Sequence, residues 1–126
     1  MVRNFLVEDT LISAVSEINN KNVMGRKIMK YNKLVRDKIP EYIRKKGEVA
    51  VFHIAEDVEY WQKLKEKLIE EVQEFQEDES IEEIADILEI LEAVADYKKF
   101  DNEEVNKIKQ KKAEERGKFK DRIILD

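Results

Sequence analysis

The stretch EEVQEFQEDESIEEIADILEILE, residues 70–92, decides the predicted fold. It contains eleven carboxylates and no Lys or Arg. On both sides of the polar turn EDES (77–80), apolar residues recur every three or four positions, which is the spacing of a buried helical face. A turn this short between two amphipathic helices predicts an antiparallel helical hairpin.

The first helix of this hairpin is predicted from Asp57 to about Glu77, and the second begins after Ser80. Ser80 and Glu83 match the Ser-x-x-Glu capping box, which is a start signal for a helix. A third helix is predicted to follow Asp101 and to end at Gly117. The expected buried stripes are Val58, Trp61, Leu64, Leu68, Val72 and Phe75 in the first helix, and Ile81, Ile84, Leu88, Leu91 and Ala95 in the second.

The rest of the chain gives weaker signals. Pro40 suits the first turn of a short helix that ends at Gly47, and residues 9–18 suit an amphipathic helix. Alternation in EVAVFHIA predicts a strand at 49–54, and the tail RIIL suggests another near 121–125. We therefore expect an all-α fold with at most these short strands. Its hairpin core is expected to complete a four-helix-type bundle on oligomerisation, with a homodimer as the simplest case.

Composition narrows the class of protein. A length of 126 residues fits one domain, and the absence of Cys excludes disulfides, thiolate metal sites and Cys nucleophiles. No apolar run approaches the roughly 18 residues of a membrane span, and the N-terminus lacks the apolar core of a secretory signal. These features predict a cytoplasmic protein without a membrane partner. The net charge of −5 disfavours general nucleic-acid binding.

Four carboxylates are predicted to meet beside the seam of the hairpin. On a wheel of about 100° per residue, Glu71 and Glu74 lie on one shoulder of the first apolar stripe. Glu83 and Asp86 lie on the shoulder of the same hand in the second helix. An antiparallel hairpin turns shoulders of the same hand to the same side. The two pairs are also level, because Glu74 precedes the turn by about as many residues as Glu83 follows it.

Such a group of negative charges at a half-buried seam raises the cost of ionising each member, and a hard divalent cation removes that cost. Oxygen ligands alone select Mg²⁺ or Mn²⁺ over zinc. The charge pattern of the chain adds a second clue, because residues 21–46 carry ten Lys and Arg against two acids, and 107–122 are basic again. These flanks could close over a metal-bound polyphosphate through Lys33, Arg36, Lys38, Lys111, Lys112 and Arg116.

A structural alternative remains open for each of these carboxylates. Glu71 and Glu74 could simply form salt bridges to the basic flanks, and Glu83 could be no more than the capping-box glutamate. The remaining glutamates of the stretch are expected to be solvated surface: Glu70, Glu77, Glu79, Glu82, Glu89 and Glu92.

The motifs EEVQE (70–74) and EIAD (83–86), in this order, resemble the EExxE…ExxD signature of the MazG-like, all-α nucleoside triphosphate pyrophosphohydrolases. The opening YNKLVRDKIP (31–40) and the closing KKAEERGKF (111–119) resemble a subgroup of small, phosphoribosyl-ATP pyrophosphohydrolase-like proteins. The similarity covers about 30–126. Residues 29–126 are therefore interpreted as a MazG-like domain, and 1–28 as an N-terminal extension, with a start-site artefact as the alternative.

The resemblance implies hydrolysis of the α–β phosphoanhydride of a nucleoside triphosphate to a monophosphate and pyrophosphate. It also implies Mg²⁺ held by two adjacent helices and a core completed by a second subunit. The ligand positions fall on Glu71, Glu74, Glu83 and Asp86, and Glu74 is the expected base, with Glu71 as its catalytic neighbour. The phosphates would meet Lys33, Arg36, Lys38, Lys112 and Arg116.

Only eight residues separate Glu74 from Glu83, fewer than in many members of that family. Base recognition is therefore expected from elsewhere in the chain or from a partner subunit. Two other functions stay open at this point. The first is hydrolysis of phosphoribosyl-ATP in histidine biosynthesis. The second is a non-enzymatic helical interaction module, in which the acidic hairpin and the basic arms pair between subunits.

Overall fold

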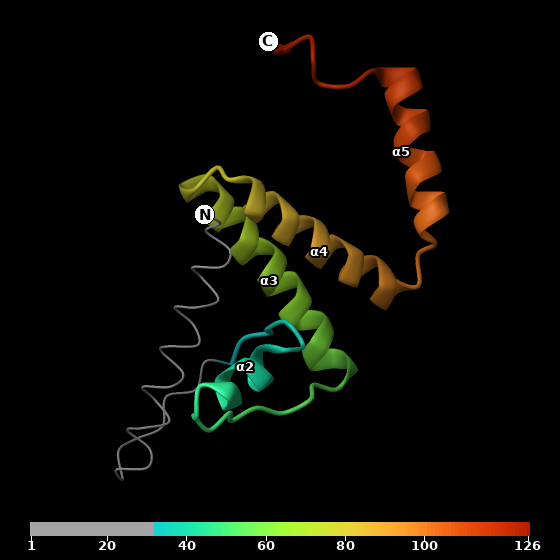
Figure 1. Ribbon diagram of the computed structural model, residues 1–126. Helices are drawn as coiled ribbons and strands as arrows, with labels where there is room; N and C mark the ends of the chain where they lie inside the picture. Colours follow the sequence, from blue (N-terminus) through green and yellow to red (C-terminus); the bar gives the residue numbers. More distant parts are fainter. Residues whose placement is uncertain (1–31) are drawn as a thin grey trace. The chain divides into compact units, whose positions relative to one another are not determined.

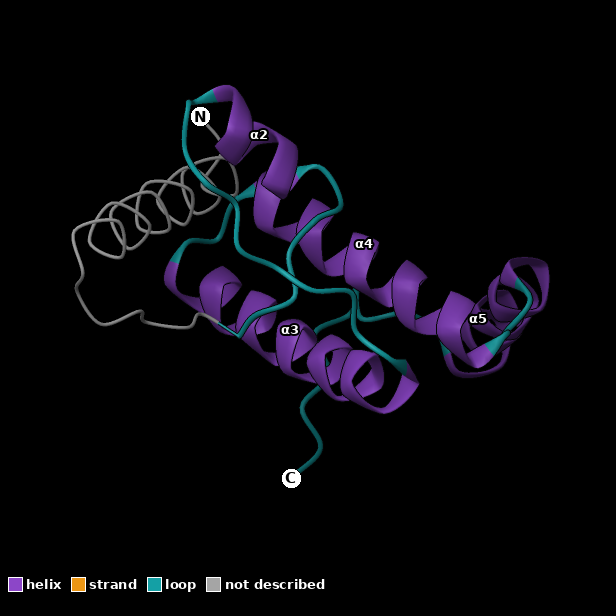
Figure 2. Cartoon of the chain, turned by 90° about the horizontal axis from the view of Figure 1, so that it is seen from below, coloured by secondary structure: helices purple, strands orange, loops and turns teal. Residues whose placement is uncertain are grey.

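The computed structural model describes residues 32–126, which form four helices and no strand (Figures 1 and 2). The helices are α2 (Ile39–Lys45), α3 (Asp57–Glu77), α4 (Ile81–Lys98) and α5 (Asn102–Arg116). The prediction of an all-α fold class is confirmed. The chain divides into two compact units between Val94 and Ala95, so that the last turn of α4 belongs to the second unit. Each unit is described by itself.

The stretches 49–54 and 121–125 are irregular, although their sequences suggested short strands. Strand geometry is stable only when a neighbouring strand pairs with its backbone groups, and the described residues provide none. The helix expected at 9–18 lies outside the described residues. No helix in the described part of the chain has both the length and the apolar composition of a membrane span.

Helix α2 begins with Pro40 in its first turn, as predicted, and ends two residues before Gly47. Gly47 takes a positive φ of 82°, which glycine adopts without steric cost, and its N–H donates to the Arg44 carbonyl at 2.9 Å. The N–H of Glu48 donates to the Ile43 carbonyl at 3.2 Å, which completes a Schellman motif. On the inner face, Ile39 and Ile43 are buried against Val35 and Ala50. This small apolar cluster fixes the segment that precedes α2.

Helices α3 and α4 form the predicted antiparallel hairpin, joined by residues 78–80 (Figure 1). The Ser80 Oγ accepts the Glu83 N–H at 3.4 Å, which is the first half of the predicted capping box. The second half is replaced, because the Ser80 N–H donates to the Asp78 carbonyl at 2.8 Å. The Glu83 carboxylate instead lies fully buried between the two helices.

The faces that the hairpin buries differ from the prediction. In α3, Leu64 is buried and Trp61, Leu68 and Phe75 are half-buried, as expected, but Val58 and Val72 are exposed. In α4 the predicted stripe is wrong: Ala95 is half-buried, and the larger side chains have exposed fractions of 42% to 78%, namely Ile81, Ile84, Leu88 and Leu91. The buried side chains of α4 are Glu83 and Asp86. The hairpin is thus rotated so that carboxylates, which we expected beside the seam, lie inside it.

This rotation gives the hairpin two unlike sides. On a helical wheel of about 100° per residue, Val72 comes one position after the buried Glu71, and Ile84 comes one position after the buried Glu83. Because the two helices are antiparallel, Val72 and Ile84 face the same side of the hairpin, which we call the apolar side. Its exposed members are Ile69, Val72, Ile84, Leu88 and Leu91. Glu74 and Asp86 lie on the opposite shoulder.

The second unit contains α5, whose predicted boundaries are confirmed. The Asp101 side chain accepts the Glu103 N–H at 3.4 Å and caps the N-terminus. The C-terminus ends at Gly117, which has a φ of 82° and donates its N–H to the Ala113 carbonyl at 2.9 Å. No residue of α5 is buried. Propensity and caps, rather than burial, therefore maintain this helix within its unit.

Candidate metal centre

Three buried carboxylates converge at the seam of the hairpin. Glu71 of α3 and Glu83 and Asp86 of α4 each offer one oxygen, and these oxygens all lie within 4.8 Å of one another. Their residues are 3%, 0% and 4% exposed. The i,i+3 spacing of Glu83 and Asp86 places both on the face of α4 that meets α3. Together with Glu74, these residues are called the carboxylate cluster below.

Glu74 stands at the edge of this group, one turn beyond Glu71 on α3. It is half-buried, and its pKa is raised by burial first and then by the negative charge of the nearby Glu83. The Oε2 atoms of Glu71 and Glu74 are buried and accept no hydrogen bond within the described part of the chain. Buried carboxylate oxygens without a donor are costly, so this arrangement leaves ligand atoms available for a cation.

The electrostatics of the carboxylate cluster oppose its ionisation. Burial raises the pKa of Glu71 above its ordinary value of 4.5, although the Lys67 ammonium lowers it in part. Burial likewise raises the pKa of Glu74, and the charge of Glu83 adds to the rise. For Asp86, burial raises the pKa above 3.8, while the hydrogen bond from Arg36 opposes the change. Bound protons or a bound cation would each relieve this strain.

Basic side chains from outside residues 70–92 supply part of the counter-charge. Arg36 donates from Nη2 to Asp86 Oδ1 at 2.6 Å, and Lys67 Nζ lies 3.2 Å from Glu71 Oε1. The stretch contains no Lys or Arg of its own, but two of its carboxylates therefore have basic partners elsewhere in the chain. The sequence reasoning missed Lys67, although the i,i+4 spacing of Lys67 and Glu71 on one helix was a usable signal.

The predicted phosphate-binding residues divide into two groups. Arg36 touches the carboxylate cluster, and Lys33 pairs with the neighbouring Glu70 at 3.2 Å. Glu70 was expected to be solvated surface, but it is half-buried and also lies 3.9 Å from the Lys67 ammonium. Lys38 is exposed at the N-cap of α2. Lys112 and Arg116 lie on α5 in the second unit, so their predicted role in this site stays a prediction.

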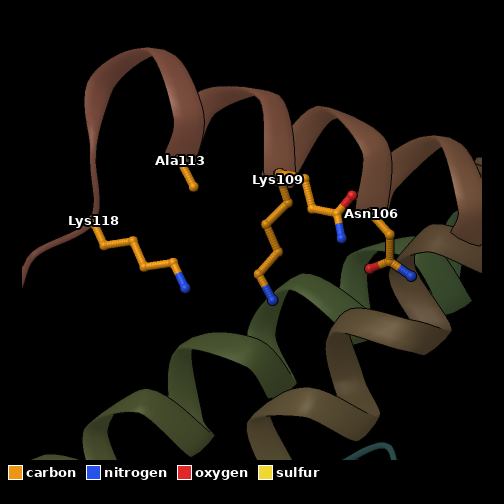
Figure 3. A pocket seen from close by; sticks show the side chains of 5 residues that line it. Asn106, Lys109, Ala113 and Lys118 are labelled. Atoms are coloured by element: carbon orange, nitrogen blue, oxygen red, sulfur yellow. The ribbon is translucent and has the colours of Figure 1, made fainter.

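The second unit has a shallow hollow of its own along α5 (Figure 3). Its lining is Asn106, Lys109, Gln110, Ala113 and Lys118. Asn106, Lys109 and Gln110 are exposed, and the hollow contains no carboxylate. It therefore has none of the ligand chemistry found in the carboxylate cluster.

Comparison with known proteins adds a short similarity. A curated protein of Mycolicibacterium smegmatis (strain ATCC 700084 / mc(2)155), described as an uncharacterized protein, is 54% identical over 39 residues. These residues make up 31% of this chain and 40% of that protein, so the chain matches less than half of that relative's length. No family model and no solved structure matches the chain. The carboxylate cluster itself therefore has to carry the functional argument.

Proposed function

We propose that this chain is a metal-dependent nucleotide pyrophosphohydrolase of the MazG-like type, acting in the cytoplasm. The reaction is hydrolysis of the α–β phosphoanhydride of a nucleoside triphosphate to a monophosphate and pyrophosphate. The observation that carries the proposal is the convergence of Glu71, Glu83 and Asp86 within 4.8 Å in a buried seam. The motif resemblance, which is independent of that geometry, selects the same residues.

Oxygen-only ligands and a compact carboxylate group fit Mg²⁺, with Mn²⁺ as an alternative. When bound, the cation would neutralise phosphate charge and lower the pKa of the attacking water. Glu74, with its raised pKa and its position at the edge of the carboxylate cluster, is the proposed acceptor of the water proton. Arg36 and Lys38, which lie in the same unit as the carboxylate cluster, are proposed to stabilise the charge that develops on the leaving pyrophosphate.

The direct test is release of pyrophosphate from a panel of canonical and modified nucleoside triphosphates in the presence of Mg²⁺. We expect Glu74→Gln and Asp86→Asn each to lower turnover on the order of 100-fold or more, the usual effect of removing a group that acts on developing charge. Glu89→Gln is the matched control, because Glu89 is exposed on the same helix. Wild-type protein that hydrolyses none of the panel, nor phosphoribosyl-ATP, would contradict the proposal.

One observation favours a second candidate, the non-enzymatic helical interaction module. The ion pairs Lys67–Glu71 and Arg36–Asp86 neutralise two members of the carboxylate cluster without any metal. Under this alternative, Mg²⁺ does not change the melting temperature. Replacing Glu71 and Glu74 together by Gln would then leave the melting temperature at its wild-type value both with and without Mg²⁺. The pyrophosphohydrolase proposal requires an Mg²⁺-dependent rise that this double variant loses.

The apolar side of the hairpin supports the proposed homo-oligomer. Exposed apolar side chains at regular helical spacing rarely form one continuous face on a monomer unless something binds there. A second copy would place an equivalent face against it and complete a four-helix bundle. Because Glu74 and Asp86 of the carboxylate cluster lie on the opposite shoulder, this packing would leave the proposed metal site open to substrate.

A further inference from the structure

The positively charged guanidinium of Arg36 is paired with Asp86, which is one of the proposed metal ligands. Its Nη2 lies 2.6 Å from Asp86 Oδ1. The two side chains differ in exposure, with 6% of the Asp86 side chain exposed against 47% of that of Arg36. The guanidinium therefore lies where the carboxylate cluster meets solvent, on the route by which a metal ion or a phosphate would arrive.

The main chain at Arg36 is held in place independently of this ion pair. The Arg36 carbonyl accepts the Ile39 N–H at 3.1 Å, in the turn that leads into α2. The adjacent Val35 packs against buried Ile39 and Ile43. An arginine side chain has several rotatable bonds, so the guanidinium can leave Asp86 while the backbone stays where it is.

A divalent cation at the carboxylate cluster cannot share Asp86 with the guanidinium at no cost, because two positive charges would approach the same buried carboxylate. We propose that Arg36 and the metal compete for Asp86, and that metal entry moves the guanidinium onto the phosphates of the substrate. This inference rests on the proposed function, since it needs a metal at that site. It adds a coupling in which metal binding prepares a phosphate-binding group.

Lys67 differs from Arg36 in the respects that matter for this exchange. Its side chain is only 16% exposed, and it lies on α3 beside two acceptors, Glu71 at 3.2 Å and Glu70 at 3.9 Å. If a metal takes Glu71, Lys67 keeps Glu70 as a partner without moving. Arg36 has the more exposed side chain, and its planar guanidinium fits phosphate oxygens in pairs. Arg36 is thus the group suited to exchange.

The test measures two ligands on the same variants. Mg²⁺ alone and then pyrophosphate with saturating Mg²⁺ are titrated by calorimetry into wild type, Arg36→Gln and Arg44→Gln. Arg44 is the matched control, because it is an exposed arginine whose guanidinium lies 5.3 Å from the Phe52 ring centre, away from the carboxylate cluster. The Arg44→Gln substitution removes one positive charge, as Arg36→Gln does, but it keeps the ion pair between Arg36 and Asp86.

For Arg36→Gln we expect Mg²⁺ affinity to rise about 10-fold, because the competitor for Asp86 is gone, and pyrophosphate affinity to fall about 10-fold. Arg44→Gln should change each by about 2-fold or less. Opposite effects on the two ligands separate competition from a merely structural role, since a damaged site would bind both more weakly. Arg36→Lys keeps the positive charge but loses the planar guanidinium with its paired donors. This variant should lower pyrophosphate affinity while leaving Mg²⁺ affinity near the wild-type value.

The outcomes against the inference are distinct from those against the proposed function. Wild type that binds Mg²⁺ and hydrolyses nucleotide, with Arg36→Gln unchanged or weaker for Mg²⁺, would overturn the exchange and leave the proposed function intact. Absence of Mg²⁺ binding in wild type and in both Arg36 variants would overturn both.

Discussion

The two sides of the α3–α4 hairpin reverse the usual relation between polarity and burial. In the seam, Glu83 is 0% exposed, whereas on the apolar side Leu88 is 61% exposed. Charged side chains are rarely fully buried without compensation, and a continuous face of exposed Leu and Ile is equally uncommon on a monomer. Both departures lie on one pair of helices. We propose that the seam of this hairpin takes a cation and that its apolar side takes a second copy of the chain.

The strongest test of this comparison is Leu64→Ala, since Leu64 is the one apolar residue of the hairpin that is fully buried. We expect the free energy of unfolding to fall by about 2–5 kcal/mol, from lost burial and the remaining cavity. Chemical denaturation provides the measurement. Ile69→Ala on the same helix is the control, and its exposed side chain should cost about 0.5 kcal/mol in the monomer. Equal costs would mean that the seam has no distinct core.

The next largest effect is expected on the apolar side itself. Leu88→Glu introduces a charge at the centre of the exposed stripe of α4, so we expect the proposed dimer to weaken by about 2 kcal/mol or more, roughly 30-fold in Kd. Light scattering coupled to size-exclusion chromatography reports the change as a shift towards monomer. Glu92→Gln, at an exposed polar position of the same helix, should leave the mass unchanged. A wild-type protein that is monomeric at every concentration would remove the second copy from the comparison.

The sequence predicted which residues form the helices better than which faces they bury. The 3/4 spacing of apolar residues, Ser80 and Asp101 as caps, and Gly117 as a stop are local signals, and the structure follows all of them. The face that a helix buries is set by its neighbours. In α4 the apolar stripe and the carboxylate shoulder are adjacent, and hydrophobicity alone pointed to the stripe, whereas packing against α3 buried the shoulder.

The meeting of three carboxylates was predictable from the sequence, whereas their basic partner from outside the hairpin was not. Residue spacing on an antiparallel hairpin brought Glu71, Glu83 and Asp86 together correctly, because helix geometry converts sequence distance into direction. The ion pair between Arg36 and Asp86 joins residues 50 positions apart, and Arg36 lies in the irregular segment that precedes α2. No periodicity extends across that segment. Its position depends on the apolar contacts of Val35 with Ile39 and Ile43, which only the folded chain reveals.

A third test uses protons in place of the cation. Because the pKa values of Glu71, Glu74 and Asp86 are raised, the folded state holds protons more tightly than the unfolded state. The metal-free protein should therefore gain stability as pH falls from about 7 through the raised values, with the gain complete below the ordinary values of 4.5 and 3.8. Melting temperature measured against pH in a chelator is the readout.

Mg²⁺ should show the opposite trend in the same pH window. Its stabilising effect requires ionised ligands and is therefore expected to shrink as pH falls, because protons occupy the same oxygens. Glu74→Gln should flatten the metal-free profile, whereas the exposed control Glu89→Gln should not. A metal-free melting temperature that falls steadily with acidification from neutral pH would show that no buried carboxylate of this cluster resists ionisation.

The smallest expected effect comes from Ser80→Ala at the start of α4. The bond from the Glu83 N–H to Ser80 Oγ is long, at 3.4 Å, so its loss should cost about 0.5–1 kcal/mol, the low end for a helix cap. Asp101→Ala at α5 removes a cap of the same length, from Glu103, and should cost about as much. The two variants should differ in metal binding. Ser80 holds the first turn of α4, which positions Glu83 in the carboxylate cluster, so only Ser80→Ala should weaken Mg²⁺ affinity, measured by calorimetry. If both variants lower it equally, the cap does not position Glu83, and burial between α3 and α4 alone holds that carboxylate in place.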